Sequence, residues 1–268
     1  MLSQLDGVPG LLVVGLNLMS ASEYKILSLD ETGKASYRHG SKNFILSGII
    51  IPENFKPKLD SSIRGLKKKY LGDEETVLHS RDLLRKKGSF AAFRDNPERE
   101  IRFWVELISF LNNPKIEMAF VIADKSKTKK LGWNEIAILK RVYNKILDEF
   151  VGKHLSSDMK GKIIAESDPA QDKYLIQAHN KLQSIGIPSY GISPSEYRSK
   201  MTCLSLVNKQ NFDVDVQIAD TLATMADVVY LTKLGKKDKI TTIQSMMKKL
   251  IERKMGNKEN PATFEILA

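Results

Sequence analysis

Three short apolar runs of this sequence each lead into a carboxylate, and this recurrence constrains the fold most. Residues 24–29 precede Asp30 and Glu31, residues 116–123 precede Asp124, and residues 162–165 precede Glu166. Their length and their β-branched and aromatic content predict buried strands. An ionised carboxylate near a core is costly unless it is paired, hydrogen-bonded or bound to a metal. The acids are therefore site candidates, although Asp30 and Glu31 could equally begin an ordinary turn.

Helical periodicity separates these strands. Further strands are expected at residues 44–51, 201–207 and, at an edge, 189–192, and helices at residues 53–71, 97–111, 134–151, 170–184, 214–234 and 239–254. Such alternation predicts an α/β fold with a mixed sheet, antiparallel in the first hairpin and parallel in the later strand-helix-strand units. We divide the chain into an N-terminal extension (residues 1–23), one domain (residues 24–234), and a C-terminal helix with a polar tail (residues 235–268).

The strand-ending acids should share one edge of the sheet, because ligands of open α/β sheets bind outside the carboxyl ends of the strands. A fourth acid, Asp220, interrupts a helical stretch that is apolar on nearly every side. An unpaired buried carboxylate would cost several kcal/mol, so a partner, a cation or hydrogen bonds from a neighbouring turn are expected there.

Several converging carboxylates favour Mg²⁺ or Mn²⁺ over zinc. In a two-metal site one ion activates water and the other stabilises the leaving oxygen of a phosphodiester, provided that the acids lie within about 10 Å of one another.

Four motifs carry a family resemblance. The sequence Leu29-Asp30-Glu31-Thr32-Gly33 resembles the Asp-Glu-Ser-Gly signature of the domain of unknown function 3800 family, which belongs to the ribonuclease H-like superfamily. Residues 78–83, 123–125 and 217–220 resemble that family's His-Ser/Ala segment, its Asp-Lys strand end and its Gln-Leu-Ala-Asp helix. Thr32 replaces the usual Ser, and Glu166 replaces an Asp.

The resemblance implies a ribonuclease H-like sheet with helical insertions. It also implies that Asp30, Glu166 and Asp220 are metal ligands, with Glu31 or Glu75 as a fourth acid. His79 and Lys125 would assist at the phosphate, although a lone His before a short helix is also a common cap. Lys125 opens a basic run, residues 125–130, that follows the strand-ending Asp124.

Charge and composition narrow the class of partner. The 42 Lys and Arg against 32 Asp and Glu give a formal charge of +10, which favours binding to the nucleic-acid backbone. The apolar run at residues 8–19 is too short to span a bilayer, which needs roughly 20 residues. We expect no membrane segment there, but an added strand, a packed helix, or a contact with a partner protein or a second copy. The single cysteine, Cys203, is expected in the core and fits a cytoplasmic protein.

A metal-dependent nuclease is the function that these features favour. One alternative is a non-catalytic module that binds nucleic acid or protein and whose acids pair with Lys or Arg. Another is a nuclease effector of a defence or toxin system that a partner protein holds inactive.

Overall fold

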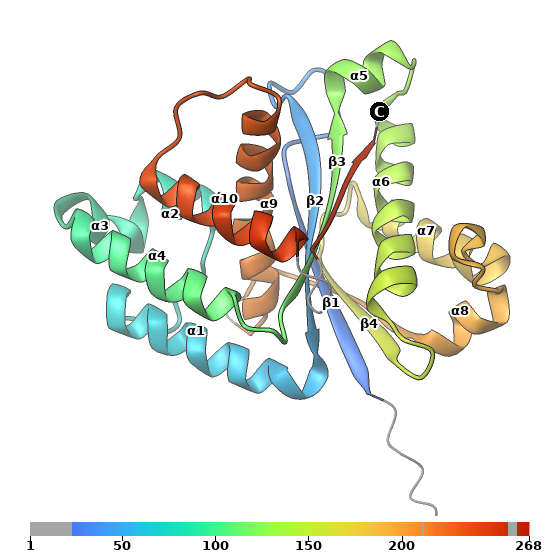
Figure 1. Cartoon of the computed structure of the whole chain (residues 1–268), viewed down its shortest axis with the longest axis horizontal. Coiled ribbons are helices and arrows are strands. Elements are labelled where there is room, and N and C mark those ends of the chain that lie inside the picture. The colour runs from blue at the N-terminus through green and yellow to red at the C-terminus, as the bar shows by residue number, and fades with distance from the viewer. Residues whose placement is uncertain (1–22, 211, 257–261, 268) are drawn as a thin grey trace, which may run out of the picture.

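The computed structural model describes residues 23–210, 212–256 and 262–267. A six-stranded sheet runs through it in the order β5–β4–β1–β2–β3–β6 (Figure 1). The antiparallel β1–β2 and β2–β3 pairs and the parallel β1–β4, β4–β5 and β3–β6 pairs confirm the predicted α/β class with a mixed sheet. The strands are β1 (Tyr24–Thr32), β2 (Asn43–Pro52), β3 (Glu117–Asp124), β4 (Lys160–Glu166), β5 (Met201–Val207) and β6 (Ala262–Leu267).

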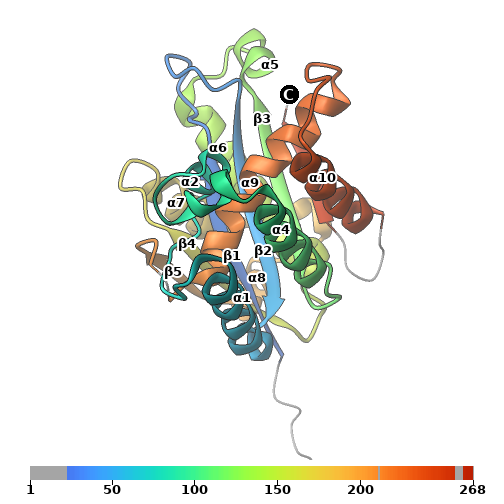
Figure 2. The same cartoon turned by 90° about the vertical axis from the view of Figure 1, so that its left-hand side faces the viewer.

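Helices cover both faces of the sheet, and each face has its own hydrophobic core (Figures 1 and 2). One face carries α1 (Lys56–Leu71), α2 (Ser80–Arg85), α3 (Ala92–Asp95), α4 (Pro97–Leu111), α9 (Val214–Lys233) and α10 (Thr242–Met255). The other carries α6 (Glu135–Glu149), α7 (Asp172–Ile185) and α8 (Pro194–Lys200). The short α5 (Lys125–Lys130) follows β3 at the edge of the sheet.

The central strand β1 is buried on both faces, so its alternating side chains serve two different layers. Ile26 packs in the core beneath α9, whereas Leu27 and Leu29 pack in the core beneath α6 and α7. Asp30 therefore faces α9 and its neighbour Glu31 faces the opposite layer.

Helix α9 packs directly on β1 and β2. Its small side chains, Ala219, Ala223 and Ala226, are fully buried and allow this close approach. The near-continuous burial of α9 agrees with its apolar sequence and brings Asp220 against the sheet.

Three sequence-based expectations are wrong. Residues 189–192 are not a strand: the 3-10 turn Pro188–Tyr190 lies between Ile187 and Ile192, which form only an isolated bridge. The expectation of a polar tail is wrong for Ala262–Leu267, which forms β6 and pairs with β3. The ring centroid of Phe264 in β6 lies 5.7 Å from that of Phe120 in β3. Cys203 is exposed because β5 is an edge strand.

The proposed contact of the N-terminal apolar run falls on residues 1–22, outside the described residues. Within the described ranges, no helix is both long enough and apolar enough to cross a membrane.

Candidate functional site

Three of the predicted acids meet at one ammonium group. The Nζ atom of Lys209 lies 2.7 Å from Asp30 Oδ2, 2.6 Å from Glu166 Oε2 and 3.2 Å from Asp220 Oδ2. Three carboxylate oxygens in contact with one nitrogen atom are far closer together than the ~10 Å that a shared metal site allows. We call Asp30, Glu166, Asp220 and Lys209 the acid–lysine cluster.

The topology explains this convergence. Asp30 and Glu166 lie near the carboxyl ends of β1 and β4, which are neighbouring parallel strands. Asp220 reaches the same edge from α9, which packs across β1. Lys209 follows β5, whose last residue, Val207, lies opposite Glu166, so that two further residues carry its side chain past the end of β4.

Asp220 is held by a loop as well as by Lys209. The backbone N–H and the hydroxyl of Ser80 donate hydrogen bonds to its two carboxylate oxygens, at 2.9 and 2.6 Å. One turn earlier on α9, Gln217 accepts a hydrogen bond from the N–H of Leu78 and donates one to the carbonyl of Gln210. The Gln-Ile-Ala-Asp segment of α9 thus fixes both loops that bring partners to Asp220, and the expected cation and turn partners are both present.

Burial and like charge dominate the electrostatics of the cluster. Burial, together with the carboxylates of Asp220 and Glu166, raises the pKa of Asp30 well above its ordinary value, although the Lys209 ammonium opposes the shift. Burial opposes ionisation of Lys209, but the surrounding carboxylates outweigh it and raise the pKa of this lysine, which remains charged. One ammonium against three carboxylates leaves an excess of negative charge that favours cations.

Glu31 and Glu75, the two candidates for a fourth acid, lie apart from the cluster. Glu31 faces the α7 layer, where it accepts a hydrogen bond of 2.8 Å from Gln171 Nε2. Burial raises its pKa despite the nearby Lys34. Glu75 is largely exposed and forms a 2.9 Å ion pair with Arg64 of α1. The structure therefore places neither carboxylate against Lys209.

His79 is the residue before Ser80 and occupies the N-cap position of α2, where its side chain forms no capping hydrogen bond. Its half-exposed ring lies 3.6 Å from Asp82 of the same helix. The segment that resembles the family motif thus brings Ser80, rather than the histidine ring, into contact with Asp220.

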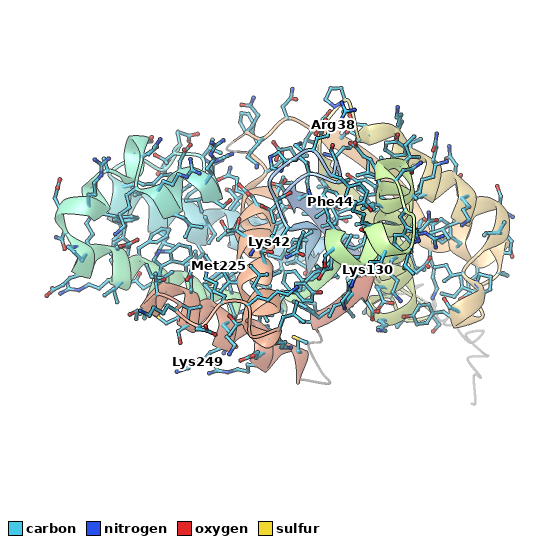
Figure 3. The ribbon with its side chains drawn as sticks, turned by 90° about the horizontal axis from the view of Figure 1, so that it is seen from above. Arg38, Lys42, Phe44, Lys130, Met225 and Lys249 are labelled. Atoms are coloured by element: carbon cyan, nitrogen blue, oxygen red, sulfur yellow. The ribbon has the colours of Figure 1, made fainter. Side chains whose placement is uncertain are left out.

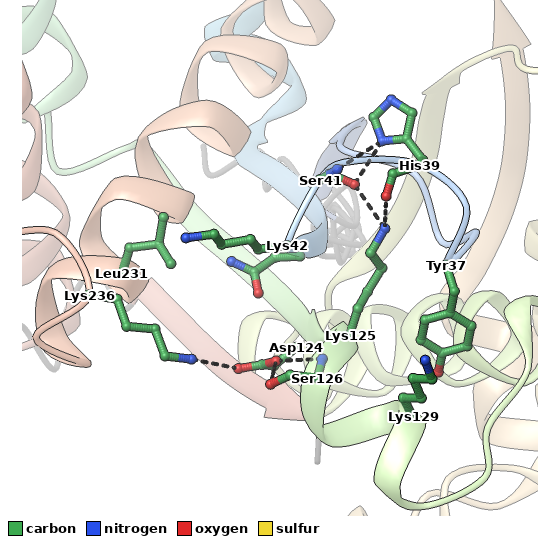
Figure 4. Close-up of a pocket in the computed structure, with 11 residues that line it drawn as sticks. Tyr37, His39, Ser41, Lys42, Asp124, Lys125, Ser126, Lys129, Leu231 and Lys236 are labelled. Carbon is green, nitrogen blue, oxygen red and sulfur yellow. Dashed lines mark hydrogen bonds and ion pairs between the residues drawn. The ribbon is translucent and has the colours of Figure 1, made fainter.

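Lys125 binds groups other than the acid–lysine cluster, and Figure 4 shows its ammonium against His39 and Ser41. Its ammonium donates hydrogen bonds to the carbonyls of Ser36 and His39, at 2.7 and 2.9 Å, and so holds the loop between β1 and β2. Asp124, the third strand-ending acid, accepts hydrogen bonds from Ser126 and from the hydroxyl of Tyr230. Both residues lie on the expected edge of the sheet but contact groups of their own.

Sequence reasoning missed Lys209 and a second buried acid, Asp215. Asp215 accepts a hydrogen bond of 2.6 Å from Ser28 and pairs with Lys56 at 2.9 Å. In the sequence, Lys209 is recognisable only as a basic residue two positions after the end of β5. Asp215 resembles any acid in the first turn of a helix.

The cluster offers the donor atoms that Mg²⁺ or Mn²⁺ prefers, in an arrangement set by the ammonium. Within the described part of the chain, no group of three or more His, Cys, Asp or Glu side chains has the geometry of a metal site. The carboxylate oxygens surround Lys209 at nitrogen–oxygen distances of 2.6–3.2 Å, whereas Mg²⁺ binds oxygen at about 2.0–2.1 Å. The donors are of the kind that Mg²⁺ prefers, but they enclose an ammonium group, so a metal could bind only if Lys209 left the centre.

No family model matches the chain, and a search of curated proteins finds no match.

Proposed function

We propose that this protein is a metal-dependent nuclease with a ribonuclease H-like fold, related to the domain of unknown function 3800 family, which hydrolyses phosphodiester bonds at the acid–lysine cluster. The observation that carries this proposal is the convergence of Asp30, Glu166 and Asp220, from three separate elements, on one cation. A fold that needed only to neutralise Lys209 would require one carboxylate. Three suit a divalent ion better.

Each residue of the acid–lysine cluster, and Ser80 beside it, has a separate role in this proposal. Asp30, Glu166 and Asp220 would hold Mg²⁺ or Mn²⁺, which supplies Lewis-acid stabilisation and an acidified water when bound. Ser80 orients the carboxylate of Asp220, and outer-shell hydrogen bonds of this kind tune ligands in metal sites. Lys209 offsets one of the three negative charges while no metal is present and, once displaced, would remain close enough to meet a phosphate oxygen.

The test is cleavage of a panel of single- and double-stranded DNA and RNA with Mg²⁺ or Mn²⁺. We expect Asp30→Asn to reduce cleavage by more than about 100-fold, beyond the 10–100-fold typical of outer-shell changes. Asp95→Asn, which alters an exposed acid of α3 outside the cluster, is the matched control and should cleave like wild type. Metal-dependent cleavage that survives Asp30→Asn would contradict the proposed site.

The second candidate is a non-catalytic module that binds nucleic acid or protein. The specific observation in its favour is that all three acids already have a lysine partner, as such a module would require. In this case the ion pairs of the cluster would serve only to hold β1, β4, α9 and the loop after β5 together. Divalent ions would then bind no more tightly to wild type than to Asp30→Asn.

A further inference from the structure

A second polar site lies on the same edge of the sheet, at the end of β3. A cavity of about 230 Å³ opens there, and its lining includes Lys42, Asn43, Asp124, Lys125, Lys129 and Lys236 (Figure 4). Drug-sized ligands occupy pockets of about 300–1,000 Å³, so this cavity suits a smaller group.

The side chains that line the cavity carry a net positive charge, and some of the lysines have no direct acidic partner among the described residues. Lys125 is held by loop carbonyls, and Lys236 lies 3.7 Å from Asp124. By contrast, Lys42 and Lys129 are exposed and form no direct ion pair within the described residues, and Lys42 acts on the carboxylate of Asp227 only at longer range. Figure 3 looks onto this edge of the molecule, with Lys42 and the neighbouring Lys130 on the surface.

Asp124 offsets only one of these charges, and its carboxylate oxygens already accept hydrogen bonds from donors of their own. Although burial opposes ionisation, hydrogen bonds from Ser126 and Tyr230 and the charge of Lys236 lower the pKa of Asp124. The carboxylate is therefore a fixed anion turned toward its own donors, and four lysines against one acid leave the cavity attractive to an anion.

Two independent paths through the fold place this cavity near the acid–lysine cluster. On β2, Asn43 lies four residues from Ser47, the partner of Asp30, which is about 13 Å along a strand. On α9, Asp227, which accepts a hydrogen bond from Asn43, lies seven residues beyond Asp220, about 10 Å along a helix. A span of 10–13 Å holds roughly three to four phosphates of one strand of a duplex.

We propose that this cavity binds a backbone phosphate of a nucleic acid, a few nucleotides from the bond at the acid–lysine cluster, through Lys42, Lys129 and Lys236. This inference rests on the proposed function for its substrate. It adds a site that fixes the register of the strand by charge without reading bases.

Binding can be tested apart from cleavage. A labelled single-stranded oligonucleotide is titrated, in EDTA and at several salt concentrations, against Asp30→Asn protein carrying Lys42→Ser, Lys129→Ser and Lys236→Ser. The control carries Lys58→Ser, Lys115→Ser and Lys181→Ser, which remove the same charge from exposed positions in α1, before β3 and in α7. Thermal unfolding checks that both triple variants fold, and the single Lys129→Ser variant repeats the test with one exposed change.

Each phosphate contact on a single strand contributes about 0.7 to the slope of log affinity against log salt, so losing the one phosphate contact in the cavity triple should lower the slope by about 0.7, and the control should leave it unchanged. Equal slopes in the two triples would overturn the proposal. So would a cavity that binds inorganic phosphate while oligonucleotide affinity is unchanged in the cavity triple. Loss of binding in the cavity triple with no cleavage by wild type would retain the phosphate site and reject the nuclease.

Discussion

Lys209 pairs with three carboxylates through a single ammonium group. Its side chain is 12% exposed, and those of Asp30 and Asp220 are 5% and 8% exposed, so water screens these charges poorly. A buried ion pair that loses one partner leaves an uncompensated charge, which is far more costly than the loss of an exposed pair. Removal of Lys209 should therefore destabilise the metal-free protein.

We predict that Lys209→Met lowers the free energy of unfolding by about 3 kcal/mol at pH 7 in EDTA, the scale expected for breaking a buried ion pair. The loss should be smaller at a lower pH, where protonation of Asp30, whose pKa burial and the neighbouring carboxylates raise, relieves the repulsion. Urea unfolding at both pH values measures this. Lys162→Met, which breaks the partly exposed 2.6 Å pair with Glu53, is the control and should change the free energy of unfolding much less. Equal stability of Lys209→Met and wild type at pH 7 would refute the role assigned to Lys209.

Asp30 gives the protein a pH dependence of definite sign. Because its pKa is raised in the folded state, the folded protein binds a proton more tightly than the unfolded chain does. Stability from this group is fully present below the unfolded pKa of about 3.9 and is lost as pH rises through the folded pKa. We predict that Asp30→Asn, unfolded by urea in EDTA, gains stability relative to wild type as pH rises. A difference that does not vary with pH would count against a raised pKa.

Among the elements, α9 links the acid–lysine cluster to the rest of the fold. It packs on β1 and β2 and, through Gln217, holds the loops that contain Leu78 and Gln210. These loops also carry Ser80 and Lys209, the partners of Asp220. The position of the cluster therefore depends on a side chain that touches none of the carboxylates.

We predict that Gln217→Ala lowers the free energy of unfolding by about 1–3 kcal/mol, because the buried N–H of Leu78 loses its acceptor. If the proposed function holds, cleavage should fall as well, since both loops are released. Gln183→Ala removes a half-buried glutamine of α7 and is the control. Unchanged stability and cleavage in Gln217→Ala would show that the loops hold their positions without it.

Long periodic elements and the acids at strand ends could be predicted from the sequence, because burial on both faces gives β1 and β3 continuous apolar runs. Topology then places Asp30 and Glu166 side by side. Lys209 could not be predicted, because a lysine in a short loop has no local signal until the pairing of β4 with β5 is known. The strand β6 was missed for the same reason, since its partner, β3, lies far away in the sequence.

At the scale of the whole molecule, β6 completes the sheet. It pairs in parallel with β3, and Phe264 packs on Phe120. Without β6, the backbone groups on the outer side of β3 would lack partners, and an exposed strand edge favours aggregation.

We predict that ending the chain after residue 261 lowers Tm by roughly 5 °C, as a loss of about 2 kcal/mol would in a protein of this size, and increases aggregation. A chain that ends after Leu267 is the control and should behave as the full chain does. Differential scanning calorimetry and light scattering measure both effects. An unchanged Tm in the shorter chain would contradict the pairing of β6 with β3.

The central claim is that Asp30, Glu166 and Asp220 form a cation site that Lys209 fills when no metal is bound. Isothermal titration of Mn²⁺ into wild type, Asp30→Asn and Lys209→Met tests it most directly, because it measures binding rather than activity. We predict saturable binding to wild type, at least about 10-fold weaker binding to Asp30→Asn, and tighter binding to Lys209→Met, which lacks the competing ammonium. Absence of Mn²⁺ binding in both wild type and Lys209→Met would contradict the claim and favour the non-catalytic module.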